Sequence, residues 1–222
     1  MRATMAVIGI ALLAIILSII VAPRGKNLTP NIQEREDERR KDEYKPNAPA
    51  PTGPAGIPVP DKFEPPMEGA VNAVISIKDR GDIGIQMYPM AAPKTVARMV
   101  ELFGGGFYNG IKIHRVESGF VVQAGDPETK SKGVDTPGIG THGSGKNIPF
   151  EKNKLPHVAG SIAMALNSPA SDTADSQWFI NLSNNHALDG QYCVFGKVNS
   201  GIDKLGQIKK GDVIEKITVA GK

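Results

Sequence analysis

Apolar residues recur at two spacings from about residue 69 to the end of the chain. Alternating or short continuous apolar runs, which are typical of β-strands, occupy residues 71–78, 83–88, 111–116, 120–124, 162–166, 178–182, 193–198 and 213–220. Helical spacing is clear after Pro93, where the apolar stripe ends at three consecutive glycines, and weaker around residues 202–208. Many short strands with two helices predict an all-β barrel or sandwich.

The stretch 126–160 lacks either pattern and is rich in glycine. Loops of this length inside compact domains are usually functional or disordered. We therefore expect a long loop between the strands at 120–124 and 162–166.

A different kind of apolar run occupies residues 5–22 near the start of the chain. Its length is just enough for a helix to cross a bilayer, which needs about 17–25 apolar residues. A cleaved secretory signal is the alternative, but Ile20-Val21-Ala22 is a poor cleavage site and Pro23 follows it. We predict an uncleaved membrane anchor over residues 1–26.

Residues 27–67 form a linker in this interpretation. Charged residues of both signs fill positions 34–43, and prolines recur every few residues from Pro46 to Pro66. Such a segment cannot build a core and favours an extended polyproline II conformation, so we interpret it as a semi-rigid spacer. The folded domain is then expected over residues 68–222.

Charge and cysteine content remove several functional classes. A net charge of +3 gives no indication of nucleic-acid binding. The single cysteine, Cys193, excludes an internal disulfide and falls in a predicted strand, where a buried apolar role is expected. The four histidines lack metal-ligand spacing, so we expect no metal, and nothing in the sequence calls for a cofactor.

Two residues are unusual for core strands. Arg115 stands among apolar residues, and Gln123 follows Val121 and Val122 on the next predicted strand. If the two strands pair, the Gln123 amide oxygen can satisfy a half-buried Arg115 guanidinium on one face, beside Phe120. His114 then points to the opposite face, where a structural role is expected.

Three blocks of the sequence resemble the cyclophilins, the peptidyl-prolyl cis-trans isomerases. They are Ile113-His114-Arg115-Val116 with the following residues to Asp126, Ser176-Gln177-Trp178-Phe179-Ile180, and Leu188-Asp189-Gly190-Gln191-Tyr192 with the following residues to Val198. The resemblance implies a closed antiparallel eight-stranded barrel capped by two α-helices. It also implies an isomerase that accelerates rotation about X–Pro bonds and assists protein folding.

The resemblance also implies a role for individual residues. Arg115 matches the catalytic arginine and Gln123 the glutamine that holds it. The residues that match substrate-binding positions are Phe120, Val121, Ala165, Leu166, Gln177, Phe179, Leu188 and Tyr192.

The chain departs from the family pattern at several of these positions. Val121 replaces a frequent methionine, and Leu166 stands where an asparagine is common, so only its main-chain contact carries over. Tyr192 stands where many members have a histidine. Ala187 stands where many eukaryotic members have a tryptophan, so weak cyclosporin binding is expected.

Two function classes stay open on the sequence. One is an active isomerase acting as a monomer on proline-containing polypeptides, without nucleic acid, anchored to a membrane with the domain outside the cytoplasm. If the N-terminal segment is cleaved, the protein is instead secreted or periplasmic. The other class is a non-catalytic module that binds proline-containing peptides near a membrane. The presence of Arg115 favours the enzyme, because a pure binder would not need it.

Overall fold

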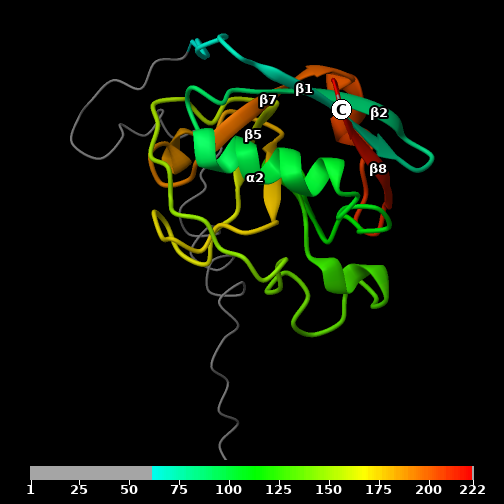
Figure 1. The fold of residues 1–222 in the computed structure, drawn as a ribbon. Helices are drawn as coiled ribbons and strands as arrows, with labels where there is room; N and C mark the ends of the chain where they lie inside the picture. Colours follow the sequence, from blue (N-terminus) through cyan, green and yellow to red (C-terminus); the bar gives the residue numbers. More distant parts are fainter. Residues whose placement is uncertain (1–61, 222) are drawn as a thin grey trace, which may run out of the picture. The chain divides into compact units, whose positions relative to one another are not determined.

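The computed structural model of the protein describes residues 62–221 (Figure 1). The predicted membrane anchor and most of the predicted linker lie outside these residues. Within the described range, no helix combines the length and the hydrophobicity needed to cross a bilayer.

Eight antiparallel strands form one sheet. In chain order they are β1 (Val71–Ile77), β2 (Gly81–Met87), β3 (Arg115–Glu117), β4 (Val121–Ala124), β5 (Ser161–Met164), β6 (Trp178–Asn181), β7 (Val194–Ser200) and β8 (Ile214–Val219). They hydrogen-bond in the order β3-β4-β6-β5-β7-β2-β1-β8. All eight predicted strands are therefore present, with ends that differ from the prediction by a few residues.

The sheet curls without closing into a regular barrel. β3 and β8 lie at its two edges and do not pair with each other as strands. A single bridge between Lys112 and Val213, just before each of these strands, joins the edges, supported by hydrogen bonds of 2.8 Å from Ile113 N to Asp212 O and from Ile214 N to Ile111 O. The expected closed barrel is thus corrected to a curled sheet, because the predicted strand 111–116 is regular only from Arg115 onward.

One α-helix is found among the described residues, α2 (Pro93–Gly104). Proline stands at its start, where the missing N–H costs nothing, and Glu151 from the long loop accepts hydrogen bonds from the N–H groups of Lys94 and Thr95 at 2.9 and 2.7 Å. The helix contacts β8 and crosses in front of the sheet in Figure 1. The prediction of this helix is confirmed.

The second predicted helix is a 3-10 helix, η3 (Ile202–Gln207), rather than an α-helix. Its apolar residues Ile202, Leu205 and Ile208 are spaced by three, which matches the three residues per turn of a 3-10 helix. Glycines at 201 and 206 also disfavour a longer α-helix. Two shorter 3-10 turns, η1 (Pro127–Lys130) and η2 (His186–Leu188), lie elsewhere in the chain.

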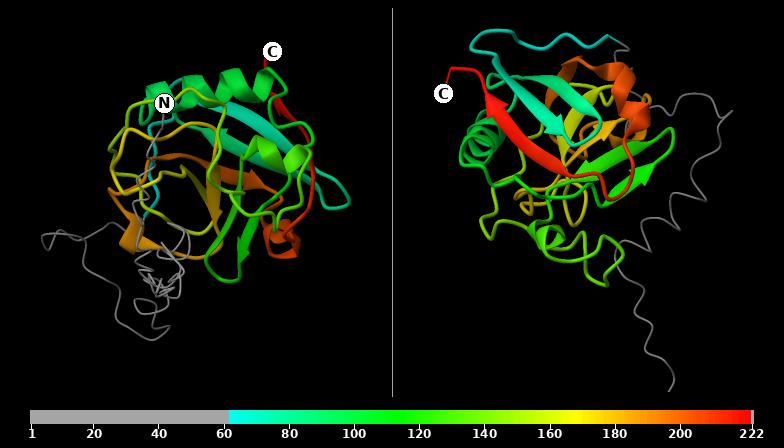
Figure 2. Two further views of the ribbon diagram at one scale, coloured as in Figure 1. Left: turned by 90° about the horizontal axis from the view of Figure 1, so that it is seen from below. Right: turned by 90° about the vertical axis from the view of Figure 1, so that its right-hand side faces the viewer.

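The main core fills the inside of the curled sheet, around which the strands wrap in the views of Figure 2. Trp178, Tyr108 and Phe103 are its largest side chains, and the Tyr108 ring lies 5.2 Å from Phe103 and 6.2 Å from Trp178. Cys193 is 2% exposed, and burial raises the pKa of its thiol to about 12. The prediction that this cysteine is a buried filler is confirmed.

Candidate active site

A row of paired residues crosses five neighbouring strands on one face of the sheet. Arg115 pairs with Gln123, Gln123 with Phe179, Phe179 with Ala163, and Ala163 with Val194. Directly paired residues of antiparallel strands point to the same face. The register therefore places the arginine, the glutamine and the phenylalanine of the predicted site side by side.

This face is opposite to the main core. On β4, for example, Val122 belongs to the core inside the sheet, while the adjacent Val121 points the other way. A second group of apolar residues, which we name the outer apolar cluster, covers this face. Its members are Tyr88, Val121, Leu155, Ala163, Phe179 and Val194, flanked by Phe63, Ala70, Ala91, Phe120, Ala165, Leu188 and Tyr192.

Most predicted substrate-binding residues meet in this cluster. Phe120, Val121, Phe179, Leu188, Tyr192 and Ala165 all belong to it. The Tyr192 ring stands edge-on to Phe179, with ring centroids 5.7 Å apart. Leu166 differs, since its side chain is 9% exposed and packs in the main core. The side chain therefore points away from the site, and the expected main-chain contact of Leu166 with substrate stays a prediction.

The Arg115 guanidinium lies at the edge of the cluster with its carbon 5.7 Å from the centre of the Phe120 ring. Its Nη1 donates to Gln123 Oε1 at 3.1 Å, as the strand pairing predicted. The side chain is 12% exposed, so its charge is largely withdrawn from water. The arrangement gives one fixed cation beside an apolar surface.

Gln123 is itself held by a chain of hydrogen bonds. Its Nε2 donates to Gln177 Oε1 at 3.0 Å, and Gln177 Nε2 donates to the carbonyl oxygens of Gly140 and His142 at 2.9 and 2.8 Å. Gln177, predicted to bind substrate, therefore also connects the arginine to the long loop.

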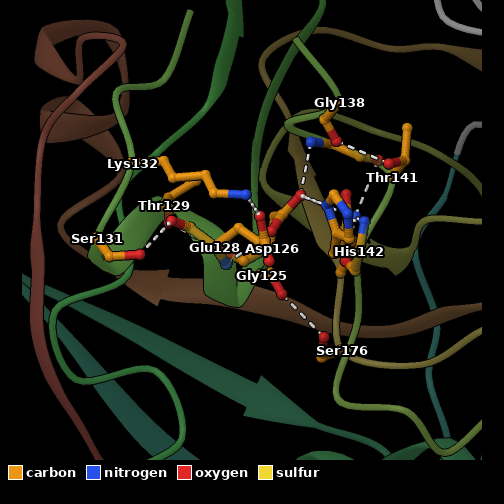
Figure 3. A network of polar contacts seen from close by, with 12 residues as sticks. Gly125, Asp126, Glu128, Thr129, Ser131, Lys132, Gly138, Thr141, His142 and Ser176 are labelled. Carbon is orange, nitrogen blue, oxygen red and sulfur yellow. Dashed lines mark hydrogen bonds and ion pairs between the residues drawn. The ribbon is translucent and has the colours of Figure 1, made fainter. Parts of the chain in front are cut away.

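Asp126 holds the same loop through a second set of hydrogen bonds (Figure 3). It is fully buried, and its carboxylate accepts hydrogen bonds from the N–H groups of Glu128 and Gly140 at 2.9 and 2.6 Å, and contacts His142. The loop predicted from its weak pattern is thus an ordered support for the residues behind Arg115.

Sequence reasoning missed an ion-pair partner of Arg115. Glu117 Oε1 accepts from Arg115 Nε at 2.7 Å and lies 2.6 Å from Nη2. The signal was present, because residues i and i+2 of a strand share a face. A charged residue before a Ser-Gly corner was instead consistent with an ordinary solvated position.

A buried histidine behind Phe179 was also missed. His157 stacks on the Phe179 ring with centroids 5.9 Å apart, and its backbone N–H and Nδ1 lie 2.6 and 3.1 Å from Asp189 Oδ1. Burial lowers the pKa of His157. Burial acts to raise the pKa of Asp189, but the hydrogen bonds from His157 and His186 outweigh it and leave that pKa below its ordinary value. His157, held by Asp189, therefore supports the Phe179 ring from behind.

No group of three or more potential ligands among residues 62–221 is arranged to hold a metal ion. A cavity of about 320 Å³ lies away from the row, between the β3–β4 corner and η3, where Val116, Gly119 and Leu205 help to line it. The site described above lies on the outer face of the sheet and is formed by other residues.

Comparisons with known proteins agree with this geometry. Residues 73–220 match the family model described as cyclophilin type peptidyl-prolyl cis-trans isomerase/CLD. A probable peptidyl-prolyl cis-trans isomerase of Brucella suis is 41% identical over 145 residues, which cover 64% of this chain and 73% of that protein. Peptidyl-prolyl cis-trans isomerase B of Bacillus subtilis is 37% identical, over 65% of this chain and 95% of that protein.

The fold has solved counterparts as well. The crystal structure of a cyclophilin-type isomerase of Cryptosporidium parvum matches with a TM-score of 0.60 and 24% identity, over 69% of this chain and 99% of that one. A second structure of that protein was determined in the presence of the dipeptide Ala-Pro.

Proposed function

The chain belongs to the cyclophilin-type peptidyl-prolyl cis-trans isomerases, and we propose that Arg115 is its catalytic residue. Rotation about an X–Pro bond meets a barrier of about 18–20 kcal/mol, because the amide loses its resonance. An enzyme lowers this barrier by binding the twisted bond more tightly than either planar form. Neither a nucleophile nor a redox group is required.

The donor that such a step needs is a fixed N–H aimed at the proline nitrogen. That nitrogen becomes pyramidal in the twisted state and gains a lone pair, so a donor placed there stabilises the transition state alone. Arg115 offers a rigid, always charged fork of donors. Gln123 fixes the fork through its 3.1 Å hydrogen bond, and we assign it as the positioning residue.

The outer apolar cluster is the binding surface in this proposal. The proline ring rests against Phe120, Val121 and Phe179, with Leu188 and Tyr192 at the side, while the peptide runs along Ala165, Leu166 and Gln177. We propose that the substrates include short X–Pro segments. Ala–Pro, the dipeptide present with the Cryptosporidium protein, is one example. The single observation that carries the proposal is the row Arg115–Gln123–Phe179.

Substitution of Arg115 tests the assignment. Loss of one preorganised donor costs on the order of 10²–10³ in rate, so Arg115→Ala should lose most of kcat/KM on a proline peptide while keeping its Tm. Arg115→Lys should fail similarly, because a point charge does not reproduce the fork. Arg80→Lys is the matched control, since Arg80 pairs with Asp212 at 2.7 Å and neither residue belongs to the row. A folded Arg115→Ala variant that keeps more than about half of the activity would refute the role.

We also propose that residues 5–22 anchor the protein in a membrane, with the isomerase domain outside the cytoplasm and residues 27–67 as the tether. The supporting observation is the unbroken apolar run followed by Pro23 and a charged, proline-rich stretch. Protease added to intact cells or spheroplasts should release the domain from membranes. A mature N-terminus at or beyond Pro23 would identify a cleaved signal, and a protected linker would place the domain inside.

A further inference from the structure

The described part of the chain begins on the same face as the active site. The Phe63 ring lies 5.7 Å from the Tyr88 ring, and Lys197 Nζ stands 4.7 Å from the centre of the Phe63 ring. Phe63 also belongs to the outer apolar cluster, which continues through Val194, on β7, and Phe179 to the residues around Arg115. The proline-rich segment therefore joins the domain at one border of its own substrate-binding surface.

The segment that precedes Phe63 is rich in the bonds that the enzyme rotates. Residues 46–60 contain Ala48–Pro49 and Ala50–Pro51, two copies of the Ala–Pro sequence, together with Gly53–Pro54, Ile57–Pro58 and Val59–Pro60. A proline-rich segment is held near an extended conformation at about 3.1 Å per residue.

Strand spacing decides which of these bonds can reach Arg115. From β7, where Lys197 holds Phe63, the sheet order runs through β5, β6 and β4 to β3. Strands lie about 4.8 Å apart, so these four steps span about 19 Å. At about 3.1 Å per residue this distance takes about six residues or more. Val59–Pro60 lies only three to four residues from Phe63 and is too close, and Ile57–Pro58 lies at the limit. Gly53–Pro54, Ala50–Pro51 and Ala48–Pro49 lie farther along the chain and satisfy this length.

We propose that the enzyme binds and isomerises its own Ala48–Pro49 and Ala50–Pro51 bonds within one molecule, so that the linker is a built-in competing substrate. The inference rests on the proposed function of Arg115. A short tether gives an effective concentration of about 1 mM or more at the site. Even a weakly bound segment with a dissociation constant of about 1 mM then occupies the site about half of the time.

The test uses the full-length, isotope-labelled protein in a mild detergent. Exchange NMR follows the cis and trans signals of Ala48 and Ala50, whose bonds otherwise interconvert over tens to hundreds of seconds. We expect exchange cross-peaks within about one second, at a rate that stays constant over a tenfold range of protein concentration. Val59–Pro60 in the same molecule is the control and should stay at the uncatalysed rate. Arg115→Lys should abolish the accelerated exchange.

Three results would overturn the inference. Slow exchange at Ala48 and Ala50 while an added Ala-Pro peptide is isomerised would refute it and leave the function of Arg115 intact. A rate that rises with protein concentration would show that the segment enters the site of a second copy. If neither the linker nor the added peptide is isomerised, the inference and the proposed function both fail.

A second measurement detects occupancy without NMR. The double variant Pro49→Ala/Pro51→Ala removes both bonds without changing any residue of the folded domain. The apparent KM for an added proline peptide should fall about twofold while kcat stays constant, as expected for removal of an intramolecular competitor at about 1 mM. An unchanged KM would contradict the proposal.

Discussion

Arg115 and Glu117 lie two residues apart on β3 and form an ion pair in which Glu117 Oε1 accepts from Nε at 2.7 Å and lies 2.6 Å from Nη2. The carboxylate therefore engages two nitrogens of the guanidinium proposed to be catalytic and places a negative charge beside the cation. It is more exposed than its partner, at 36% against 12%. Water around Glu117 screens the charges and so reduces the energy of the ion pair.

Glu117→Gln should raise the activity. The change removes the opposing charge, so the guanidinium acts more strongly on the proline nitrogen. An exposed ion pair contributes about 0.2–1 kcal/mol, which corresponds to an increase in kcat of about 1.5- to 5-fold. Steady-state kinetics on a proline peptide measure the change in kcat. A decrease in kcat would mean that Glu117 positions Arg115 instead of restraining it.

Gly125 has no room for a side chain. Its φ is +113°, and a Cβ atom would lie 2.2 Å from the carbonyl oxygen of Ser176 and 2.6 Å from the Cα of Gln177. Strained backbone and overpacking cost about 1–3 kcal/mol each, so Gly125→Ala should lower the free energy of unfolding by about 3 kcal/mol or more. Urea denaturation measures the loss.

Gly206 is the matched control for this substitution. No atom lies within 4 Å of a Cβ built there, and its backbone does not require glycine. Gly206→Ala should change the free energy of unfolding by less than about 0.5 kcal/mol. Equal effects at Gly125 and Gly206 would contradict the argument from space.

The parts of the site that the sequence predicted are those whose signal is local. Arg115 and Gln123 stand out because polar residues interrupt apolar runs on two neighbouring strands, and strand alternation alone places them on one face. Phe179 is an ordinary core residue by pattern, so its place in the site depended on the resemblance. The register of β4 and β6 then set it beside Gln123.

The parts that the sequence did not predict depend on contacts between distant residues. His157 and Asp189 are 32 positions apart and meet only after the long loop folds back, so no spacing rule connects them. The junction of the two sheet edges at Lys112 and Val213 is likewise a property of the curled sheet, not of either segment. The local sequence pattern predicts the strands, but only the tertiary fold shows how the two edges of the sheet meet.

Cyclosporin affinity should respond to residue 187. Ala187 is exposed on η2, beside Leu188 of the outer apolar cluster, and stands where many eukaryotic cyclophilins have a tryptophan. A buried interface aromatic is worth about 2 kcal/mol or more, so Ala187→Trp should tighten cyclosporin binding by about 30-fold while isomerase activity stays similar. Titration calorimetry measures the cyclosporin affinity of both proteins. Nanomolar binding by the unchanged chain would contradict the idea.

Acid should destabilise the domain through His114. This residue is 7% exposed, and burial, only partly opposed by the negative charge of Asp126, lowers its pKa to about 4. Below its ordinary pKa of 6.5 the unfolded chain takes up a proton that the folded protein does not, so stability falls as the pH decreases from 6.5 to about 4. Since one pKa unit corresponds to about 1.4 kcal/mol, the full loss approaches about 3 kcal/mol. His114→Gln cannot titrate, so its Tm should depend less on pH across this range. The remaining slope comes from His157, whose pKa burial also lowers, and toward pH 4 from Asp189 and Asp212, whose pKa values, despite burial, are lowered by hydrogen bonds. Calorimetric melting of both proteins at several pH values measures the difference, and NMR titration of the His114 ring checks its cause. Parallel Tm profiles for the two proteins would show that His114 is not the group responsible.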